Sequence, residues 1–293
     1  MSAVARAPKR APPRGACDTH AHVFGPPERF PPRVETAYPP PDAPVEGHRA
    51  MLGAAGMTRG VLVQPAVYGD DHDALIDALG GDGLIGVASL GAETRDSDLD
   101  WLHAAGVRGL RFVEARDPSG ARYRGTVGFD ALPALAPAMR ALGWHAELWA
   151  PAERIVAEAE MLQRLQLPVV LGHLGGMAAE QGLDDPTNSA LIAAVADRGF
   201  WVKLVVCRAS RNWPDYADAR ALHAVLIAAA PERMLWGSDW PHVRMGERSP
   251  DVGHLLDLFD AWIEQDDALR HAILVRNPER LYGFAPLDEK EVA

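Results

Sequence analysis

Short apolar runs alternate with helical patterns along almost the whole chain, and this alternation restricts the fold more than any other sequence feature. The runs that read as strands are 16–23, 60–65, 84–90, 107–113, 144–149, 169–173, 200–206 and 234–239. The helical segments between and after them are 48–56, 71–79, 99–105, 132–142, 152–165, 189–198, 217–230, 252–262 and 267–275. Strands that alternate with helices form a parallel sheet, and one α/β barrel takes about 250 residues. We therefore predict a single-domain (β/α)8 TIM barrel over residues 16–293.

Prolines interrupt this pattern in two places, because proline lacks an amide N–H and fixes its own backbone. Residues 26–44 hold too many prolines for a helix or a central strand, so we predict a long ordered loop after the first strand. Long loops inside compact domains are usually functional. Pro133 and Pro137 are expected to break the helix over 132–142 into short pieces.

The first 15 residues read neither as a signal peptide nor as part of the barrel. They lack the continuous apolar core that a signal peptide requires. Their alanines and prolines are interspersed with the basic residues Arg6, Lys9, Arg10 and Arg14. We predict that residues 1–15 form a flexible basic N-terminal arm.

Charge and cysteine content indicate which kind of partner the protein binds and in which cellular compartment it is expected. The net charge of −11 is spread along the chain, which disfavours nucleic acid or an anionic membrane surface as the main partner. No run reaches the roughly 18 apolar residues of a membrane helix. Cys17 and Cys207 belong to no metal motif or disulfide framework, so a reducing cytoplasm is expected. The expected partner is a small molecule, and the sequence leaves the oligomeric state open.

Histidine, aspartate and arginine side chains stand where predicted strands end. His20 and His22 are one residue apart near the end of the first strand, so both point to the same side. Alone, such a pair could equally form hydrogen bonds at a polar strand end. However, His173 ends the sixth strand, Asp239 ends the eighth, and Arg111 lies near the end of the fourth. Chemistry in this fold occurs at the carboxyl ends of the strands, so we predict that these residues share one site.

Several sequence phrases resemble the amidohydrolase superfamily, specifically amidohydrolase-related family 2 and its branch of 2-pyrone-4,6-dicarboxylate lactonases. The phrases are HVFGP, YPPPDAP, VLVQPAVYG, GVRGLRFV, GWHAELW, PVVLGHLGG, WVKL, WGSDWPH and NPERLYGF. They extend from about His20 to Phe284, which is nearly the whole predicted barrel. The resemblance implies a barrel enzyme that opens a lactone ring.

The resemblance also bears on whether a metal takes part. Metal-dependent members of the superfamily add a histidine or a modified lysine at the end of the fifth strand. Here that strand, 144–149, has no lysine, and His145 lies at its beginning. The resemblance to the pyrone lactonases implies a metal-independent enzyme, so no cofactor is expected. Zinc or another divalent metal is the alternative, with His20, His22 and Asp239 as ligands and His173 nearby.

Roles for individual residues follow from the resemblance and from their chemistry. Asp239 is expected to accept a proton from the attacking water and return it to the leaving oxygen. The three histidines are expected to donate hydrogen bonds to the lactone carbonyl. Arginine forks suit carboxylate groups on a substrate. The substrate-binding residues implied are Arg111, Tyr38, Arg208 and His242, with Arg116, Arg124, Gln64 and Arg244 as further candidates.

The chain also departs from the pyrone lactonase pattern. Ala66 replaces a small hydroxyl residue, Gly176 replaces the arginine of an HMGR phrase, and Arg244 replaces a polar residue. A missing hydrogen bond in a buried site is worth about 1–3 kcal/mol, enough to change substrate preference. We therefore predict a hydrolase for an anionic lactone, expected to be a dicarboxylate from aromatic or sugar-acid catabolism. The alternatives are a zinc-dependent hydrolase or decarboxylase, a sugar-acid lactone isomerase, and a non-catalytic binding protein.

Overall fold

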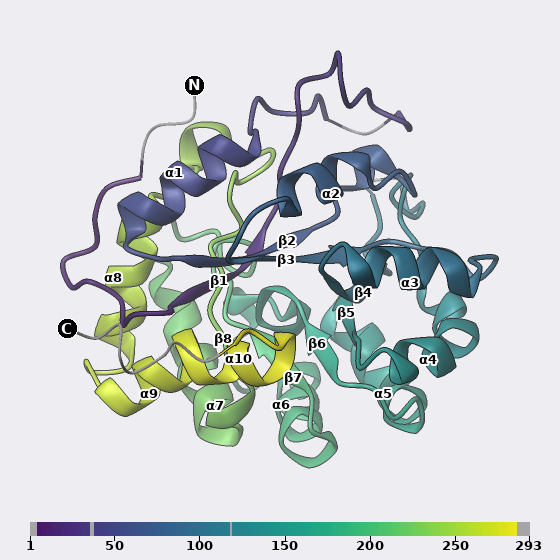
Figure 1. Cartoon of the computed structure of the whole chain (residues 1–293). Coiled ribbons are helices and arrows are strands. Elements are labelled where there is room, and N and C mark those ends of the chain that lie inside the picture. Colours follow the sequence, from purple (N-terminus) through teal and green to yellow (C-terminus); the bar gives the residue numbers. More distant parts are fainter. Residues whose placement is uncertain (1–4, 36–37, 118, 286–293) are drawn as a thin grey trace.

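Eight parallel strands form one sheet in the order of the chain, and helices surround it (Figure 1). The computed structural model describes residues 5–35, 38–117 and 119–285. The strands are β1 (Cys17–Ala21), β2 (Arg59–Val63), β3 (Leu84–Ala88), β4 (Val107–Val113), β5 (His145–Trp149), β6 (Val169–Leu171), β7 (Trp201–Lys203) and β8 (Met234–Leu235). The predicted (β/α)8 barrel is confirmed.

The barrel closes through the segment that follows β8 rather than through β8 itself. The amide of Thr19 donates to the carbonyl of Trp236 over 3.0 Å, and that of His22 donates to Trp240 over 2.8 Å. The amide of Asp239 donates to the carbonyl of His20 over 2.8 Å. These bonds pair β1 with residues 236–240, so Asp239 lies beside the two histidines of the first strand.

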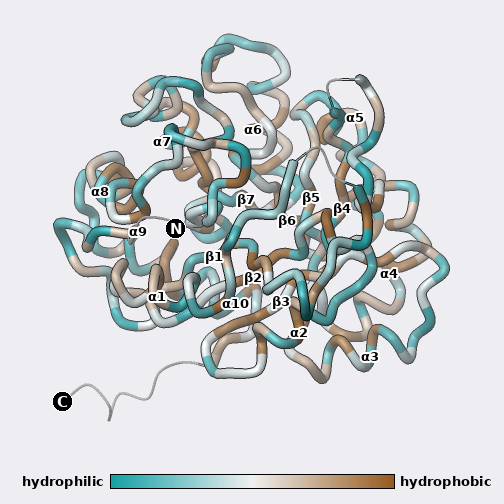
Figure 2. Tube along the Cα trace, turned by 90° about the horizontal axis from the view of Figure 1, so that it is seen from above, coloured by the Kyte–Doolittle hydropathy of each residue, from teal (hydrophilic) through white to brown (hydrophobic). Residues whose placement is uncertain are grey.

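The helices cover the outside of the strands, and hydrophilic residues predominate in the outer turns and loops (Figure 2). Apolar side chains fill both the barrel and the layer between strands and helices. Among the described residues, no helix combines the length and apolarity needed to cross a membrane. The helices are α1 (Val45–Ala55), α2 (Asp73–Leu79), α3 (Asp96–Ala104), α4 (Leu132–Ala141), α5 (Ala152–Arg164), α6 (Pro186–Arg198), α7 (Arg220–Ala229), α8 (Val252–Trp262), α9 (Asp267–His271) and α10 (Asn277–Tyr282).

The prediction that prolines fragment the helix over 132–142 is wrong. α4 is continuous, with Pro133 in its first turn, where the amide N–H needs no helical partner. Pro137 lies inside the helix and removes one hydrogen bond. Leu135 and Met139 are buried on the same helix, so packing against the barrel compensates for that loss.

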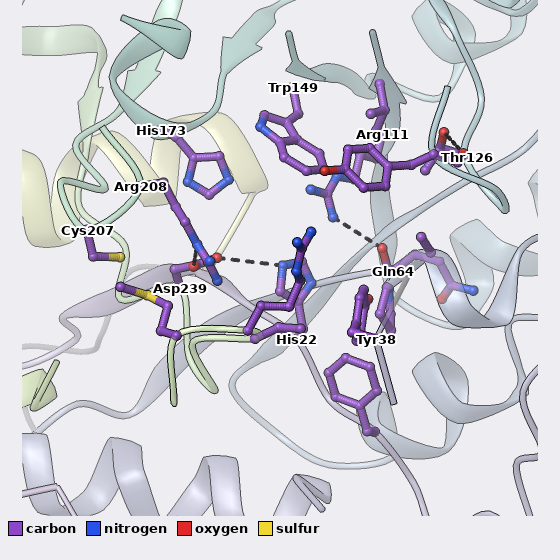
Figure 3. Close-up of a pocket in the computed structure, with 18 of the residues that line it drawn as sticks. His22, Tyr38, Gln64, Arg111, Thr126, Trp149, His173, Cys207, Arg208 and Asp239 are labelled. Atoms are coloured by element: carbon purple, nitrogen blue, oxygen red, sulfur yellow. Dashed lines mark hydrogen bonds and ion pairs between the residues drawn. The ribbon is translucent and has the colours of Figure 1, made fainter. Parts of the chain in front are cut away.

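Six strands end earlier than predicted, and the early ends of three of them, β6, β7 and β8, shape the mouth of the barrel. β6, β7 and β8 end before the residues at which the apolar pattern stops. His173 and Asp239 have positive φ angles of 50° and 64°, so neither residue continues an extended strand. The sharp turns at these positions direct both side chains toward the centre of the mouth (Figure 3).

The described part of the N-terminal segment, residues 5–15, contacts the last helices of the barrel. Arg6 forms ion pairs with Asp251 and Asp257, and Arg10 pairs with Asp267. The backbone amide of Lys9 donates to Asp257 over 2.7 Å. Basic side chains of this segment therefore offset acidic charge at α8 and α9.

The free energy of unfolding is expected to fall at acid pH because of His223, which lies away from the mouth of the barrel. His223 of α7 packs against Phe259 and Trp262, and burial lowers its pKa from 6.5 to about 3. Below pH 6.5 the unfolded chain therefore binds a proton that the folded chain does not, and stability falls as the pH falls. In His223→Phe, the slope of unfolding free energy against pH should be smaller by about 1.4 kcal/mol per unit between about pH 4 and 6.

Denaturant unfolding at a series of pH values measures this slope. His271→Gln, at an exposed position of α9, is the control and should leave the slope unchanged. Equal slopes for the parent and His223→Phe would contradict the expectation.

Candidate active site

A cavity of about 730 Å³ opens at the carboxyl ends of the strands. Its walls include residues at or beyond the ends of all eight strands (Figure 3). The predicted site residues among them are His22, Tyr38, Gln64, Arg111, His173, Arg208, Asp239 and Arg244. The cavity therefore lies at the end of the barrel where active sites of this fold are found.

Of the residues predicted as catalytic, His22, His173 and Asp239 line this cavity, and the buried ring of His20 packs against both histidines. Nε2 of His20 lies 3.6 Å and Nε2 of His22 lies 3.8 Å from Oδ1 of Asp239. The ring centroids of His20 and His173 are 4.8 Å apart. Side chains from the ends of β1, β6 and β8 thus converge on one small volume.

Arg208 keeps the carboxyl group of Asp239 ionised. Its Nε lies 2.5 Å from Oδ2 of Asp239. Burial alone would raise the pKa of Asp239, but the positive charge of Arg208 holds this pKa well below its usual value. Asp239 is therefore a carboxylate at neutral pH, with Oδ2 bound to arginine and Oδ1 facing the histidines.

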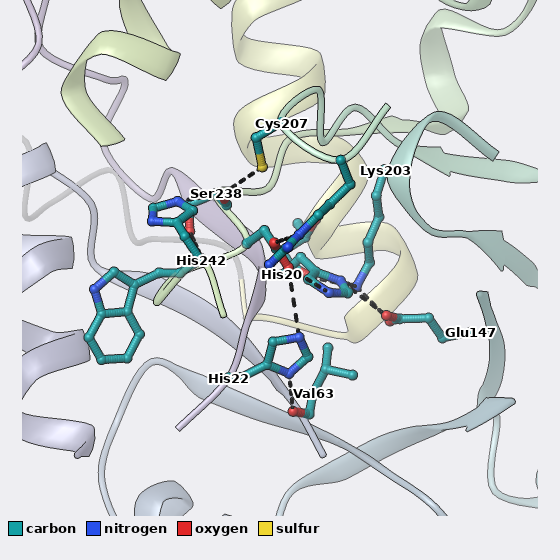
Figure 4. A network of polar contacts seen from close by, with 12 residues as sticks. His20, His22, Val63, Glu147, Lys203, Cys207, Ser238 and His242 are labelled. Carbon is teal, nitrogen blue, oxygen red and sulfur yellow. Dashed lines mark hydrogen bonds and ion pairs between the residues drawn. The ribbon is translucent and has the colours of Figure 1, made fainter. Parts of the chain in front are cut away.

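His22 is held in one tautomer by the backbone of β2. Its Nδ1 lies 2.8 Å from the carbonyl oxygen of Val63, which can only accept a hydrogen bond, so Nδ1 carries the ring proton (Figure 4). Burial and the charge of Arg111 lower the pKa of His22 to about 3, so the ring is neutral near pH 7. The Nε2 atom that faces Asp239 is consequently an acceptor.

Arg111 brings a buried cation to the opposite wall. Its guanidinium lies 5.3 Å from the ring centroid of Trp149, and Nη1 lies 3.4 Å from the carbonyl oxygen of Gln64. Tyr123 stacks on Trp149, with ring centroids 5.5 Å apart. These contacts hold a cation and an aromatic surface beside each other in the cavity wall.

Three residues expected to bind substrate do not line the cavity. Arg116 pairs with Glu114 and Arg124 pairs with Glu35, each over 3.3 Å. Buried Glu114 also accepts a hydrogen bond from the amide of Phe129, so it organises this loop and attracts Arg116.

His242 is the third of these residues, and its buried Nε2 lies 3.1 Å from the carbonyl oxygen of Ser238. Arg244, by contrast, lines the cavity and supplies a cation from the loop after β8.

Two functional candidates were missed by the sequence reading. Lys203 of β7 and Glu147 of β5 form a fully buried ion pair, with Nζ 2.5 Å from Oε2 (Figure 4). Burial would raise the pKa of Glu147, but the ammonium of Lys203 holds it well below its usual value. Nδ1 of His20 lies 3.1 Å from Oε1 of Glu147. A charged residue inside each of two short apolar strands was the available signal, since such charges are rarely buried without a partner.

The donor atoms meet only part of what a metal requires. Among the described residues, one group could hold an ion: His20, His173 and Asp239, whose ligand atoms lie within 4.8 Å of one another. Three ligands suffice for catalytic zinc. However, Arg208 already binds Asp239, and Nζ of Lys203 lies 3.3 Å from Nδ1 of His20. Glu147 balances the charge of Lys203, so the opposing charge is the guanidinium of Arg208, which already occupies Asp239, and this donor set does not fit a metal.

The chain is similar to known proteins and structures over most of its length. It is 34% identical over 276 residues to the 4-sulfomuconolactone hydrolase of Rhizobium radiobacter, covering 92% of this chain and 91% of that one. It is 32% identical to a 2-pyrone-4,6-dicarboxylate hydrolase of Comamonas testosteroni, covering 92% and 90%. A crystal structure of ATU3138 from Agrobacterium tumefaciens has a TM-score of 0.84 at 30% identity, covering 96% and 98%. The profile of the Amidohydrolase family matches residues 17–284, and with these relatives it shows that the chain belongs to this amidohydrolase family.

Proposed function

We propose that the protein is a hydrolase that opens the ring of an anionic lactone without a metal. The observation that carries this proposal is the meeting of a carboxylate, Asp239, with the neutral acceptor His22 in a cavity lined by Arg111 and Arg208. Relatives at 34% and 32% identity are named as hydrolases of a sulfomuconolactone and a pyrone dicarboxylate.

The attacking water would lie between Asp239 and His22. Oδ1 of Asp239 and Nε2 of His22 are both acceptors and are 3.8 Å apart, so one water can donate to each. As the water oxygen bonds to the lactone carbon, Asp239 takes its proton. When the ring C–O bond breaks, Asp239 returns that proton to the leaving oxygen. This geometry gives His22 the role of orienting water, in place of the carbonyl-donor role expected from sequence.

Arg208 links substrate binding to this step. While its guanidinium binds Asp239, the carboxylate is a weak base, because the neighbouring positive charge holds the pKa low. An anionic group on the substrate competes for the same guanidinium. Its arrival would weaken the ion pair and raise the basicity of Asp239 when a lactone is present.

The cavity wall combines cations, an aromatic surface and polar groups, and the cations favour an acidic ring. The hydroxyl of Thr126 donates to the carbonyl of Tyr123, and that of Ser210 donates to Asp218. Nε2 of Gln64 donates to the carbonyl of Asp71. Oε1 of Gln64 and the hydroxyl of Tyr216 have no hydrogen-bond partner among the described residues, so the cavity also offers polar groups to a substrate. Beside them it presents cations and the apolar surface of Trp149.

Isomerisation is the second candidate, since a D-galactarolactone isomerase of Agrobacterium fabrum is 31% identical over 289 residues. It would require the water position to be excluded and an internal hydroxyl to attack the carbonyl. Product mass separates the two reactions, because hydrolysis adds one water and isomerisation leaves the mass unchanged.

Removing the proposed base should abolish most turnover. Asp239→Asn keeps the shape of the side chain but cannot take a proton, and kcat/KM should fall by about 10² to 10⁴-fold. The assay is a panel of a pyrone dicarboxylate, a muconolactone, a sugar-acid lactone and an uncharged lactone, read by product mass. Asp130→Asn, at an exposed position beside α4, is the control and should retain parent activity. Opening of no lactone by the parent, or full activity of Asp239→Asn, would refute the proposal.

Chelation should leave the enzyme active. The charge of Arg208 beside Asp239 opposes a divalent ion, so we expect substoichiometric metal after purification and unchanged kcat after treatment with a chelator. Elemental analysis and lactone assays before and after chelation test this. Stoichiometric zinc, with activity lost on chelation and restored by zinc, would instead support the zinc-dependent alternative.

A further inference from the structure

We propose that Lys203 is a positioning residue that keeps the ring proton of His20 on Nε2, so that His20 presents a hydrogen-bond donor to the cavity. Neither Lys203 nor His20 is among the residues that line the cavity. Lys203 acts through the histidine, and His20 faces the site through Asp239, which lines the cavity and lies 3.6 Å from its Nε2. The inference rests on the proposed function for its catalytic meaning, but the position of the proton is a property of the protein alone.

The three N–H groups of the Lys203 ammonium have three partners. Its side chain is wholly buried, with Nζ 2.5 Å from Oε2 of Glu147 and 2.6 Å from the carbonyl oxygen of Thr19. The third contact is Nδ1 of His20, at 3.3 Å. An ammonium group has no lone pair, so in this contact Nδ1 must be the acceptor.

Glu147 is the competing partner for the same ring atom. Its Oε1 lies 3.1 Å from Nδ1 of His20, yet among the described residues Oε1 has no partner with hydrogen-bond geometry. A proton on Nδ1 would also face the ammonium of Lys203, placing two donors against each other. Three satisfied donors on Lys203 therefore favour an unprotonated Nδ1.

With Nδ1 unprotonated, a neutral His20 carries its proton on Nε2. This atom is buried, has no hydrogen-bond partner among the described residues, and lies 3.6 Å from Oδ1 of Asp239 at the base of the cavity. It can donate to the lactone carbonyl and to the oxyanion that forms when water attacks. His20 and His22 then hold opposite tautomers, one a donor toward the carbonyl and the other an acceptor toward water.

The simpler reading is that Lys203 and Glu147 form only a structural ion pair between β5 and β7. That reading assigns no tautomer to His20 and expects equal effects from removing either charge. The proposal separates the two residues, because only Lys203 donates to Nδ1.

Long-range ¹H–¹⁵N spectra of the full protein labelled at histidine nitrogens test this, with His20→Gln used to assign the signal. The parent should show His20 with its proton on Nε2. Lys203→Met, similar in length but without a donor, should move the proton to Nδ1, where Glu147 can accept it. Glu147→Gln leaves the Lys203 donor and should keep the proton on Nε2.

On a lactone that the parent opens, kcat of Lys203→Met should fall by about 10²-fold with little change in KM, since a transition-state donor is lost. A proton on Nδ1 or a doubly protonated ring in the parent would overturn the proposal, as would an unchanged tautomer in Lys203→Met. The parent spectrum needs no variant and no substrate. A failure of lactone hydrolysis is therefore distinguishable from a failure of this inference.

Discussion

The pairing of β1 with residues 236–240 is the interaction on which the site depends. It closes the barrel with main-chain hydrogen bonds and sets Asp239 directly beside the histidines of the first strand. Because these bonds are between backbones, the carboxylate is placed by the fold and not by its own side-chain contacts. Its bond to Arg208 then fixes its charge, and both histidine contacts follow from the same register.

Most of the architecture could be predicted from the apolar pattern, since strands and helices differ in period and length. β4 and α8 have the predicted bounds. The apolar pattern gave wrong element bounds where tertiary packing overrides the preference of the local sequence. It could not show that α4 tolerates Pro137, because that depends on what the helix packs against. It also extended β6 and β8 too far, since apolar residues continue through turns whose positive φ angles have no clear sequence signature.

The candidate site was predictable as far as strand ends determine it. His20, His22, His173 and Asp239 converge because the barrel rule places strand ends together. Loop residues were less predictable, because a nearby carboxylate decides where a flexible arginine points, as Glu114 does for Arg116. The pair of Lys203 and Glu147 was overlooked because its members are far apart in sequence, and only the closed barrel brings them into contact.

The hydrogen bond from His22 to the carbonyl of Val63 has a consequence for how such a site can change over time. The orientation of this histidine depends on a main-chain atom, which no side-chain substitution at position 63 removes. Residues that shape the cavity wall, such as Ala66 and Arg244, lie instead on the segments that follow the strands. Substitutions in these segments can therefore change which ring is bound, while the strands keep the groups that attack it in place.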